Sequence, residues 1–134
     1  MRGVCVFDID NTLTCGNPAR AVQACRDANY EIAINTARPV AWLEPRLQAL
    51  GLPLPGAPAF HFNPDSFQQS ELERAEYKGQ AMHKIATYFG TENLVLFDDI
   101  PANVEAARRH GYRGQLVSAR GACGVSDEDL LALL

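Results

Sequence analysis

The chain has 134 residues, a mass of 14.7 kDa and a formal charge of −4 at pH 7, with 12 basic against 16 acidic side chains. This is about one domain's length, and 47% hydrophobic with 21% charged residues is typical of a folded globular protein, which argues against a multidomain assembly and against disorder. The acidic balance also argues against a general electrostatic attraction to DNA or other polyanions.

The first half of the chain alternates short apolar runs with amphipathic stretches. Val4–Phe7 is a continuous apolar run, typical of a strand buried on both faces of a parallel sheet. A helical stripe over Ala19–Ala28 precedes a second apolar run at Tyr30–Ile34, and the three segments predict one βαβ unit. A further helix is expected over Pro39–Leu50, with Pro45 kinking it or shortening its start.

The second half continues the alternation. Its predicted elements are, in order, a strand at Ala59–Phe62, a helix most regular over Lys78–Phe89, a strand at Leu94–Phe97, a helix at Asn103–His110 and a weak strand at Gln115–Ser118. Ser126, with Asp129 three residues later, resembles the capping box of a terminal helix through Leu134. This order predicts a doubly wound, mostly parallel sheet, in which ligands bind beyond the carboxyl ends of the strands.

The four cysteines stand far apart in the chain, at positions 5, 15, 25 and 123, without a C-x-x-C pair or zinc-finger spacing. We interpret them as reduced, mostly buried thiols. The N-terminal apolar run is too short for a signal peptide, and no stretch approaches the roughly 20 apolar residues of a membrane span. We therefore expect a cytosolic protein without a membrane partner.

Two acidic pairs follow the two most apolar predicted strands. Asp8 and Asp10 come after the first strand, and Asp98 and Asp99 come after the fourth. If those strands are neighbours, four carboxylates converge, and their repulsion costs stability unless a cation or a shared proton compensates. Mg²⁺ is the cation that suits carboxylate and carbonyl oxygen. Acids after strands also serve as helix caps, but two pairs at matched strand ends favour the metal site.

Phosphoryl transfer is the chemistry that needs such a site. A cation between carboxylates neutralises a phosphoryl group and lets one carboxylate approach as the nucleophile, and a second acid two residues away can protonate the leaving oxygen. Hydrogen-bond donors for the phosphoryl oxygens are needed as well, and Thr36 and Lys78 are candidates. Taken separately, Thr36 could instead cap the next helix, and Lys78 could be an ordinary surface charge.

Four stretches resemble, in order, the motifs of the haloacid dehalogenase (HAD) superfamily. The first is VFDIDNTLT at residues 6–14, the second is INTARP at residues 34–39, the third is represented by Lys78, and the fourth is LFDDIPAN at residues 96–103. The resemblance covers residues 4 to about 118. It implies a three-layer, Rossmann-like α/β fold with a central, mostly parallel five-stranded sheet and helices on both faces.

The resemblance also implies the roles of the acidic residues. Asp8 would be the nucleophile that forms an aspartyl-phosphate, and Asp10 would be the general acid that protonates the leaving group and then the base that activates water. Mg²⁺ would be held by Asp8, by the backbone carbonyl of Asp10 and by one acid of the fourth motif. We favour Asp99 as that direct ligand and Asp98 as its support, an order that the sequence does not settle.

The other matched residues complete a phosphatase. Thr36 would hold the phosphoryl oxygens, Lys78 would balance the charge of Asp8 and the phosphate, and Asn103 would order the metal loop. An acid at position 10 is similar to the phosphatase branch of the superfamily rather than to its ion pumps or its phosphonate-cleaving members. The expected reaction is the Mg²⁺-dependent hydrolysis of a phosphate monoester.

The spacing of the motifs leaves little room for the cap domain that many HAD phosphatases close over small substrates. Only 28 positions separate Asp8 from Thr36, and the 42 from Thr36 to Lys78 must also supply a helix and a strand, which leaves at most a small flap around Asn63–Ser70. We therefore expect a single capless domain over residues 1–134. By analogy with capless relatives, the substrate is expected to be a phosphorylated macromolecule, a phosphoprotein more than a nucleic-acid end, because of the charge.

Other functions stay open beside this one. A small-metabolite phosphatase could have its site closed by an oligomer partner. A receiver domain uses similar residues as a switch without turnover, but its phosphorylated Asp follows the third strand, whereas the acids here follow the first and the fourth. A scaffold that has lost the reaction is the third alternative, although every catalytic role is filled.

Aromatic residues gather near the predicted site. Trp42 and the group of Phe60, His61, Phe62 and Phe67 could form a wall against the leaving group, but a core or subunit-contact role is the favoured interpretation. The three histidines at positions 61, 83 and 110 have no spacing that predicts a metal site or a triad, and we treat them as ordinary residues.

Overall fold

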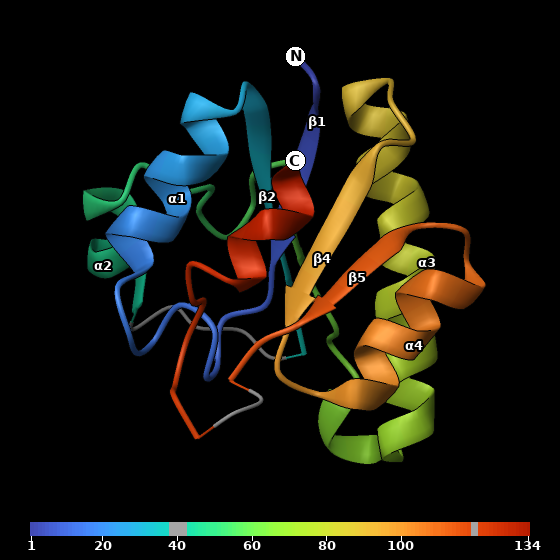
Figure 1. The fold of residues 1–134 in the computed structure, drawn as a ribbon. Helices are drawn as coiled ribbons and strands as arrows, with labels where there is room; N and C mark the ends of the chain where they lie inside the picture. Colours follow the sequence, from blue (N-terminus) through green and yellow to red (C-terminus); the bar gives the residue numbers. More distant parts are fainter. Residues whose placement is uncertain (38–42, 119–120) are drawn as a thin grey trace.

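A computed structural model describes residues 1–37, 43–118 and 121–134. The described residues include a five-stranded sheet in the order β3-β2-β1-β4-β5, and every neighbouring pair of strands is parallel (Figure 1). The predicted α/β, Rossmann-like fold is therefore confirmed. Because β1 lies between β2 and β4, the two predicted acidic strand ends are neighbours.

The elements follow one another as predicted, with small shifts of their ends. The strands are β1 (Gly3–Phe7), β2 (Tyr30–Thr36), β3 (Phe60–Phe62), β4 (Leu94–Asp98) and β5 (Arg113–Leu116). The α-helices are α1 (Pro18–Asp27), α2 (Glu44–Ala49), α3 (Glu71–Phe89) and α4 (Pro101–Arg109), and two described 3₁₀ turns are η2 (Ser66–Gln68) and η3 (Asp129–Leu133).

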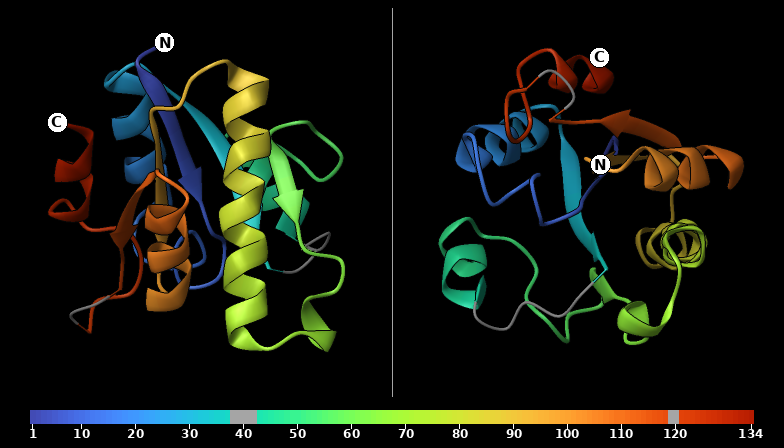
Figure 2. Two further views of the ribbon diagram at one scale, coloured as in Figure 1. Left: turned by 90° about the vertical axis from the view of Figure 1, so that its right-hand side faces the viewer. Right: turned by 90° about the horizontal axis from the view of Figure 1, so that it is seen from below.

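The helices lie on both faces of the sheet and make three layers (Figures 1 and 2). Successive side chains of a strand point to opposite faces, so Cys5 and Phe7 of β1 pack in a cluster with α1 and α2, whereas Val4 and Val6 pack in a second cluster with α3 and α4. Both faces of β1 are therefore apolar. This double burial is the reason for the continuous apolar run in the sequence.

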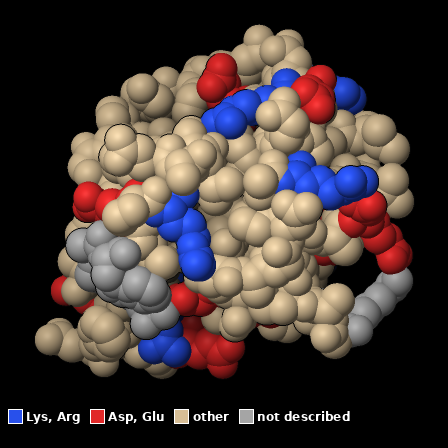
Figure 3. All heavy atoms as spheres, turned by 90° about the vertical axis from the view of Figure 1, so that its left-hand side faces the viewer, with Lys and Arg blue, Asp and Glu red and all other residues tan. Residues whose placement is uncertain are grey.

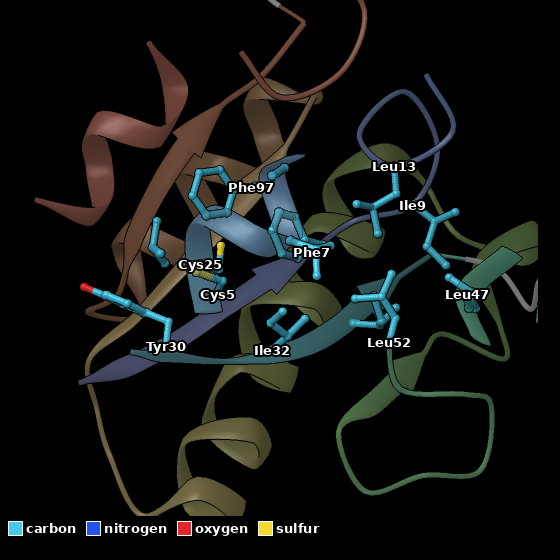
Figure 4. Packing of buried hydrophobic residues seen from close by; sticks show 14 of the residues in the cluster. Cys5, Phe7, Ile9, Leu13, Cys25, Tyr30, Ile32, Leu47, Leu52 and Phe97 are labelled. Carbon is cyan, nitrogen blue, oxygen red and sulfur yellow. The ribbon is translucent and has the colours of Figure 1, made fainter. Parts of the chain in front are cut away.

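The cluster on the α1 side also holds the chain that follows β1. The rings of Phe7 and Phe97 stack with their centroids 5.2 Å apart, and Figure 4 shows Ile9 and Leu13 beside Phe7. Ile9 is 1% exposed and Leu13 is 2% exposed. Because these apolar residues are buried, the segment between them is fixed at the end of the sheet.

Two predicted helices differ from the observed ones. The helix expected over Pro39–Leu50 is the six-residue α2, and Pro45 stands in its first turn; residues 38–42, including Pro39 and Trp42, lie outside the described residues. The predicted C-terminal helix is the short 3₁₀ turn η3. Its capping box is present, because Ser126 and Asp129 each bind the other's backbone N–H through their side chains.

The prediction that all four cysteines are reduced is wrong. Cys15 and Cys123 form a disulfide across 108 positions, while Cys5 and Cys25 are free and buried. Such a pair cannot be read from spacing, because it forms only when the segments after β1 and β5 meet in the folded chain. The disulfide also removes one support for a cytosolic location, since disulfides persist mainly in oxidising compartments.

The surface mixes charges of both signs. On the face seen in Figure 3, basic and acidic side chains are interspersed. Exposed ion pairs such as Arg20 with Asp127, at 2.7 Å, add to this mixture. Within the described parts of the chain, none of the helices has the length and apolar character needed to span a bilayer.

Candidate active site

Three carboxylates meet where β1 and β4 end. The two strands pair in parallel, with Phe7 opposite Phe97, so Asp8 and Asp98 leave the sheet side by side. Oxygen atoms of Asp8, Asp98 and Asp99 all lie within 4.8 Å of one another. Asp8 is 4% exposed and Asp98 is fully buried. Three of the four carboxylates that were predicted to converge therefore lie together.

Lys78 brings a buried positive charge to these acids. Its Nζ donates to Oδ1 of Asp8 at 2.9 Å and to Oδ2 of Asp98 at 2.8 Å. The side chain is only 3% exposed, so the alternative of an ordinary surface lysine is wrong. Asn35 of β2 donates from its Nδ2 to the Lys78 carbonyl at 3.0 Å and fixes the helix against the sheet.

The position of Lys78 depends on a well-defined helix start. Ser70 and Glu73 form a capping box in which each side chain accepts from the other's backbone N–H, at 3.2 and 3.1 Å. Gly90 ends α3 in the left-handed conformation with φ 69°. These two signals fix where α3 begins and ends. They therefore help to decide which side chains of the helix, Lys78 among them, face the ends of the strands.

The charges of the site do not balance. Three carboxylates face one ammonium, so two negative charges are uncompensated when all groups are ionised. Burial raises the pKa of Asp8 to about 7; Lys78 opposes this rise, and the charges of Asp98 and Asp99 add to it. Burial alone would lower the pKa of Lys78, but Asp8 and Asp98 outweigh burial and hold that pKa above its usual value.

Asp98 and Asp99 have different surroundings. The carboxylate of Asp98 accepts three hydrogen bonds. Nζ of Lys78 and Nδ2 of Asn103 donate to its Oδ2, and the backbone N–H of Ile100 donates to its Oδ1. Asp99 is partly exposed and accepts from Nδ2 of Asn11 at 3.2 Å. Asp98 is therefore held by the protein, whereas Asp99 faces outward from the same cluster.

Thr36 and Asp10 lie at the same edge of the sheet. Thr36 ends β2 and is 1% exposed. The carboxylate of Asp10 is not in the three-acid group found among the described residues. Instead, Asp10 lines a neighbouring pocket of about 280 Å³ together with Ala37, Ser66, Phe67 and Arg74. Asp10 thus stands between the acidic cluster and an open pocket.

Two asparagines belong to the site although sequence reasoning assigned them no role. Asn11 contacts Asp99 through its side chain, and its carbonyl accepts from the Ser118 hydroxyl at 2.6 Å. Asn35 holds Lys78. Both stand next to predicted site residues, so their adjacency to Asp10 and Thr36 was a usable signal. Their partners are 43 to 107 positions away, and only the fold identifies them.

The aromatic residues near the site divide into two kinds. Phe60 is 6% exposed and belongs to the core, as favoured from the sequence. Phe62 is 38% exposed and Phe67 is 86% exposed. A core role is therefore wrong for Phe67, and a subunit contact there stays a prediction.

Comparisons with known proteins support the fold alone. No protein-family model matches the chain, and no curated protein matches it. An uncharacterized protein from Corynebacterium glutamicum has a similar structure with a TM-score of 0.59 at 19% identity, over 87% of this chain and 84% of that one. DsGPDH of Dunaliella salina has a TM-score of 0.64 at 17% identity over 99% of this chain, which spans 29% of that protein.

A third solved structure is a HAD family hydrolase from Deinococcus radiodurans R1 with bound phosphate and sodium. Its TM-score is 0.47 at 18% identity, over 89% of this chain and 51% of that one. At these identities the similarities concern the arrangement of helices and strands.

Proposed function

We propose that this protein is a Mg²⁺-dependent phosphatase that hydrolyses phosphate monoesters through an aspartyl-phosphate on Asp8. The observation that carries the proposal is the group of three carboxylates, two of them buried, with one lysine, Lys78, which leaves two negative charges uncompensated. A divalent cation held by these residues would supply the missing positive charge. The residues of this group are also the ones that resemble the HAD motifs.

The donor set fits a hard divalent ion. Asp8, Asp98 and Asp99 offer only oxygen atoms, which Mg²⁺ prefers, and the exposed side of Asp99 leaves room for the waters that Mg²⁺ retains. Asp98 accepts three hydrogen bonds, from Lys78, Ile100 and Asn103, and is the most strongly held of the three acids, so we propose Asp8 and Asp99, with the carbonyl of Asp10, as the direct ligands. Asp98 supports them, and Asn103 orients Asp98.

The reaction then follows from the placement of the side chains. Bound Mg²⁺ would neutralise the phosphoryl group. The Asp8 carboxylate, held at Oδ1 by Lys78, attacks phosphorus while the bond to the leaving oxygen breaks. Asp10 donates its proton to that oxygen and next takes a proton from the water that cleaves the aspartyl-phosphate. Thr36 donates to the phosphoryl oxygens, and Lys78 balances the charge of Asp8.

The substrate is proposed to be bulky, and the domain to be capless. Between β3 and α3 the chain consists of residues 63–70 with the single turn η2, which is a small flap rather than a lid. Topology argues against the receiver alternative, since the acidic cluster follows β1 and β4 while Asn63 follows β3. A cytosolic location stays a prediction from the sequence.

A chromogenic phosphate ester tests the activity. We expect sustained phosphate release with MgCl₂, none with EDTA, and none from Asp8→Asn, which keeps the size of the side chain but cannot form the aspartyl-phosphate. Asp27→Asn, at the exposed end of α1, is the matched control and should be fully active. Labelling of Asp8 that stops after one equivalent would favour the receiver-like switch. No release by the wild type would contradict the phosphatase.

A further inference from the structure

An exposed aromatic side chain stands beside Asp10. Phe67 lies in the turn η2 between β3 and α3, and 86% of it is exposed. Figure 2 shows this segment at the end of the molecule to which the strand arrows point, next to the start of α3. Phe67 and Asp10 line the same pocket of about 280 Å³. A ring so exposed contributes little to the core, and its faces are open to contact by a ligand.

The segment that presents Phe67 is held at its beginning by Asn63. This side chain is 3% exposed. Its Oδ1 accepts from the backbone N–H of Asp65 at 3.0 Å, and its Nδ2 donates to Oε1 of Gln69 at 2.7 Å. The amide thus closes a turn around the 3₁₀ segment and joins its two ends.

The side chain of Arg74 in α3 also holds this segment. Its Nη1 donates to the carbonyls of Ser66 and Gln69, at 3.3 and 2.6 Å, on either side of Phe67. Ser66 itself is 5% exposed. The backbone around Phe67 is therefore fixed by side chains although the ring is in solvent. A fixed backbone is suited to presenting the ring to a ligand, because the segment loses little conformational freedom on binding.

We propose that Phe67 is the platform on which the leaving group of the phosphate ester stacks, and that the substrate class is a monoester whose alcohol carries a planar ring. The inference deepens the phosphatase proposed above and depends on it, because Asp10 must reach the leaving oxygen to protonate it. The leaving group then lies in the pocket that Asp10 shares with Phe67.

The pocket and the ring together define the ligand chemistry. A volume of about 280 Å³ lies at the lower end of the range for small-molecule sites, so it suits one ring system. Aromatic rings attract other planar rings in offset or edge-on arrangements. A nucleobase and a benzyl-type or tyrosyl ring share this chemistry, and both occur as parts of larger phosphorylated molecules.

Two matched substrate pairs measure the contribution of the ring. Benzyl phosphate and cyclohexylmethyl phosphate are both esters of primary alcohols of similar size, and only the first has a planar ring. Adenosine 5′-phosphate and ribose 5-phosphate share the same ester linkage, and only the first has a base. For each pair the ratio of kcat/KM for the member with the planar ring to kcat/KM for the member without it isolates stacking from the chemistry of the ester.

We expect the wild type to prefer the member with the planar ring in at least one pair by about 5- to 150-fold, the range of one aromatic stacking contact. Phe67→Ala should bring that ratio to about 1, mainly by lowering kcat/KM for the planar-ring member, and Phe67→Trp should preserve it. Tyr88→Ala, which removes a 56% exposed ring at the far end of α3, should leave every value unchanged. The pair that responds identifies the nucleobase or the aryl source.

The possible failures can be told apart. A ratio near 1 in the wild type for both pairs, or a ratio that Phe67→Ala does not change, would overturn the platform while the phosphatase stands. Hydrolysis of the chromogenic ester but of none of these four esters would overturn the platform alone, and hydrolysis of none of the five would overturn both proposals. Because Phe67 is largely in solvent, Phe67→Ala should melt within a few degrees of the wild type, and that measurement confirms that a lost preference is not lost folding.

Discussion

Lys78 and Asp8 are 70 positions apart in the chain, yet Nζ of Lys78 lies 2.9 Å from Oδ1 of Asp8 with both side chains almost completely buried. The contact ties α3 to the end of β1. The same ammonium lies 2.8 Å from Oδ2 of Asp98 at the end of β4. One buried cation thus links three elements of the fold and the acidic cluster, so both stability and chemistry depend on it.

Replacing Lys78 should destabilise the metal-free protein strongly. Lys78→Met keeps the length of the side chain but leaves two buried carboxylates without a counter-ion, a change that typically costs about 3–5 kcal/mol. Urea unfolding at pH 7 with EDTA measures the loss, and added Mg²⁺ should restore more stability to the variant than to the wild type. The control is Lys84→Met, an exposed position on the same helix. Equal losses for the two variants would contradict the role of Lys78.

The pH dependence of stability should carry the signature of Asp8. Its pKa in the folded, metal-free protein is raised to about 7 from the ordinary 3.8. A raised pKa means that the protonated group favours folding, so its contribution is complete below about pH 4 and is lost as the pH rises to about 7. The raised pKa of Lys78 adds no slope in this window, because Lys78 stays protonated in both states.

Asp8→Asn isolates this effect, since asparagine does not titrate. With EDTA present, the free energy of unfolding of the wild type should fall relative to that of Asp8→Asn between pH 4 and pH 7. With Mg²⁺ present the fall should be smaller, because the cation stabilises the carboxylate. Parallel pH curves for the two proteins in EDTA would show that Asp8 titrates normally.

Asp10→Asn tests the general acid. Loss of a general acid typically lowers turnover by about 10²–10⁴-fold, and we expect that loss in kcat for an ester with a poor leaving group. The amide keeps the backbone carbonyl, so stabilisation of the protein by Mg²⁺ should stay close to that of the wild type. Esters with good leaving groups should lose less activity, because they need less protonation. Near-normal turnover on all esters would exclude the assigned role.

Much of the fold follows from the apolar pattern. Continuous apolar runs mark β1 and β4 because both faces of these central strands are covered, and the helices show their apolar stripes and terminal glycines. Besides the shortened α2, the weaker predictions concern the C-terminal part of the chain. β5 begins two residues earlier than expected, at Arg113, and the last helix is the turn η3. These segments lie at the edge of the sheet, where fewer neighbours constrain the sequence.

The acidic part of the candidate site could be predicted from the sequence. Asp8 and Asp98 stand out in the sequence because they follow apolar strands, whereas Lys78 taken alone looks like an ordinary surface charge; the structure adds the distances between the three. The disulfide and the pairing of His83 with His110 were not predictable. Both join residues whose proximity is set by packing between elements, and neither pair has local spacing that signals a contact.

The disulfide between Cys15 and Cys123 should contribute strongly to stability. A crosslink that closes a loop of 108 positions restricts the unfolded chain, and removal of a native disulfide typically costs about 2–5 kcal/mol. Cys15→Ser with Cys123→Ser should lower the melting temperature, and a dithiol reductant should lower that of the wild type without affecting the double variant. Thiol titration of the unfolded, unreduced wild type should give two thiols; four thiols would contradict the bridge.

Gly79 should resist a substitution that helices normally favour. Alanine in place of glycine inside a helix usually stabilises by about 0.5–1 kcal/mol, but a Cβ at Gly79 would lie 2.5 Å from Cδ2 of His110 and 3.2 Å from the carbonyl of Ala106. The His110 ring cannot simply swing aside, because it is hydrogen-bonded to Glu76 at 2.8 Å and to His83 at 3.0 Å. Gly79→Ala should therefore destabilise by about 1–3 kcal/mol in urea unfolding. In a His110→Ala background the same change should cost clearly less, and an equal cost in both backgrounds would show that the ring is not the obstacle.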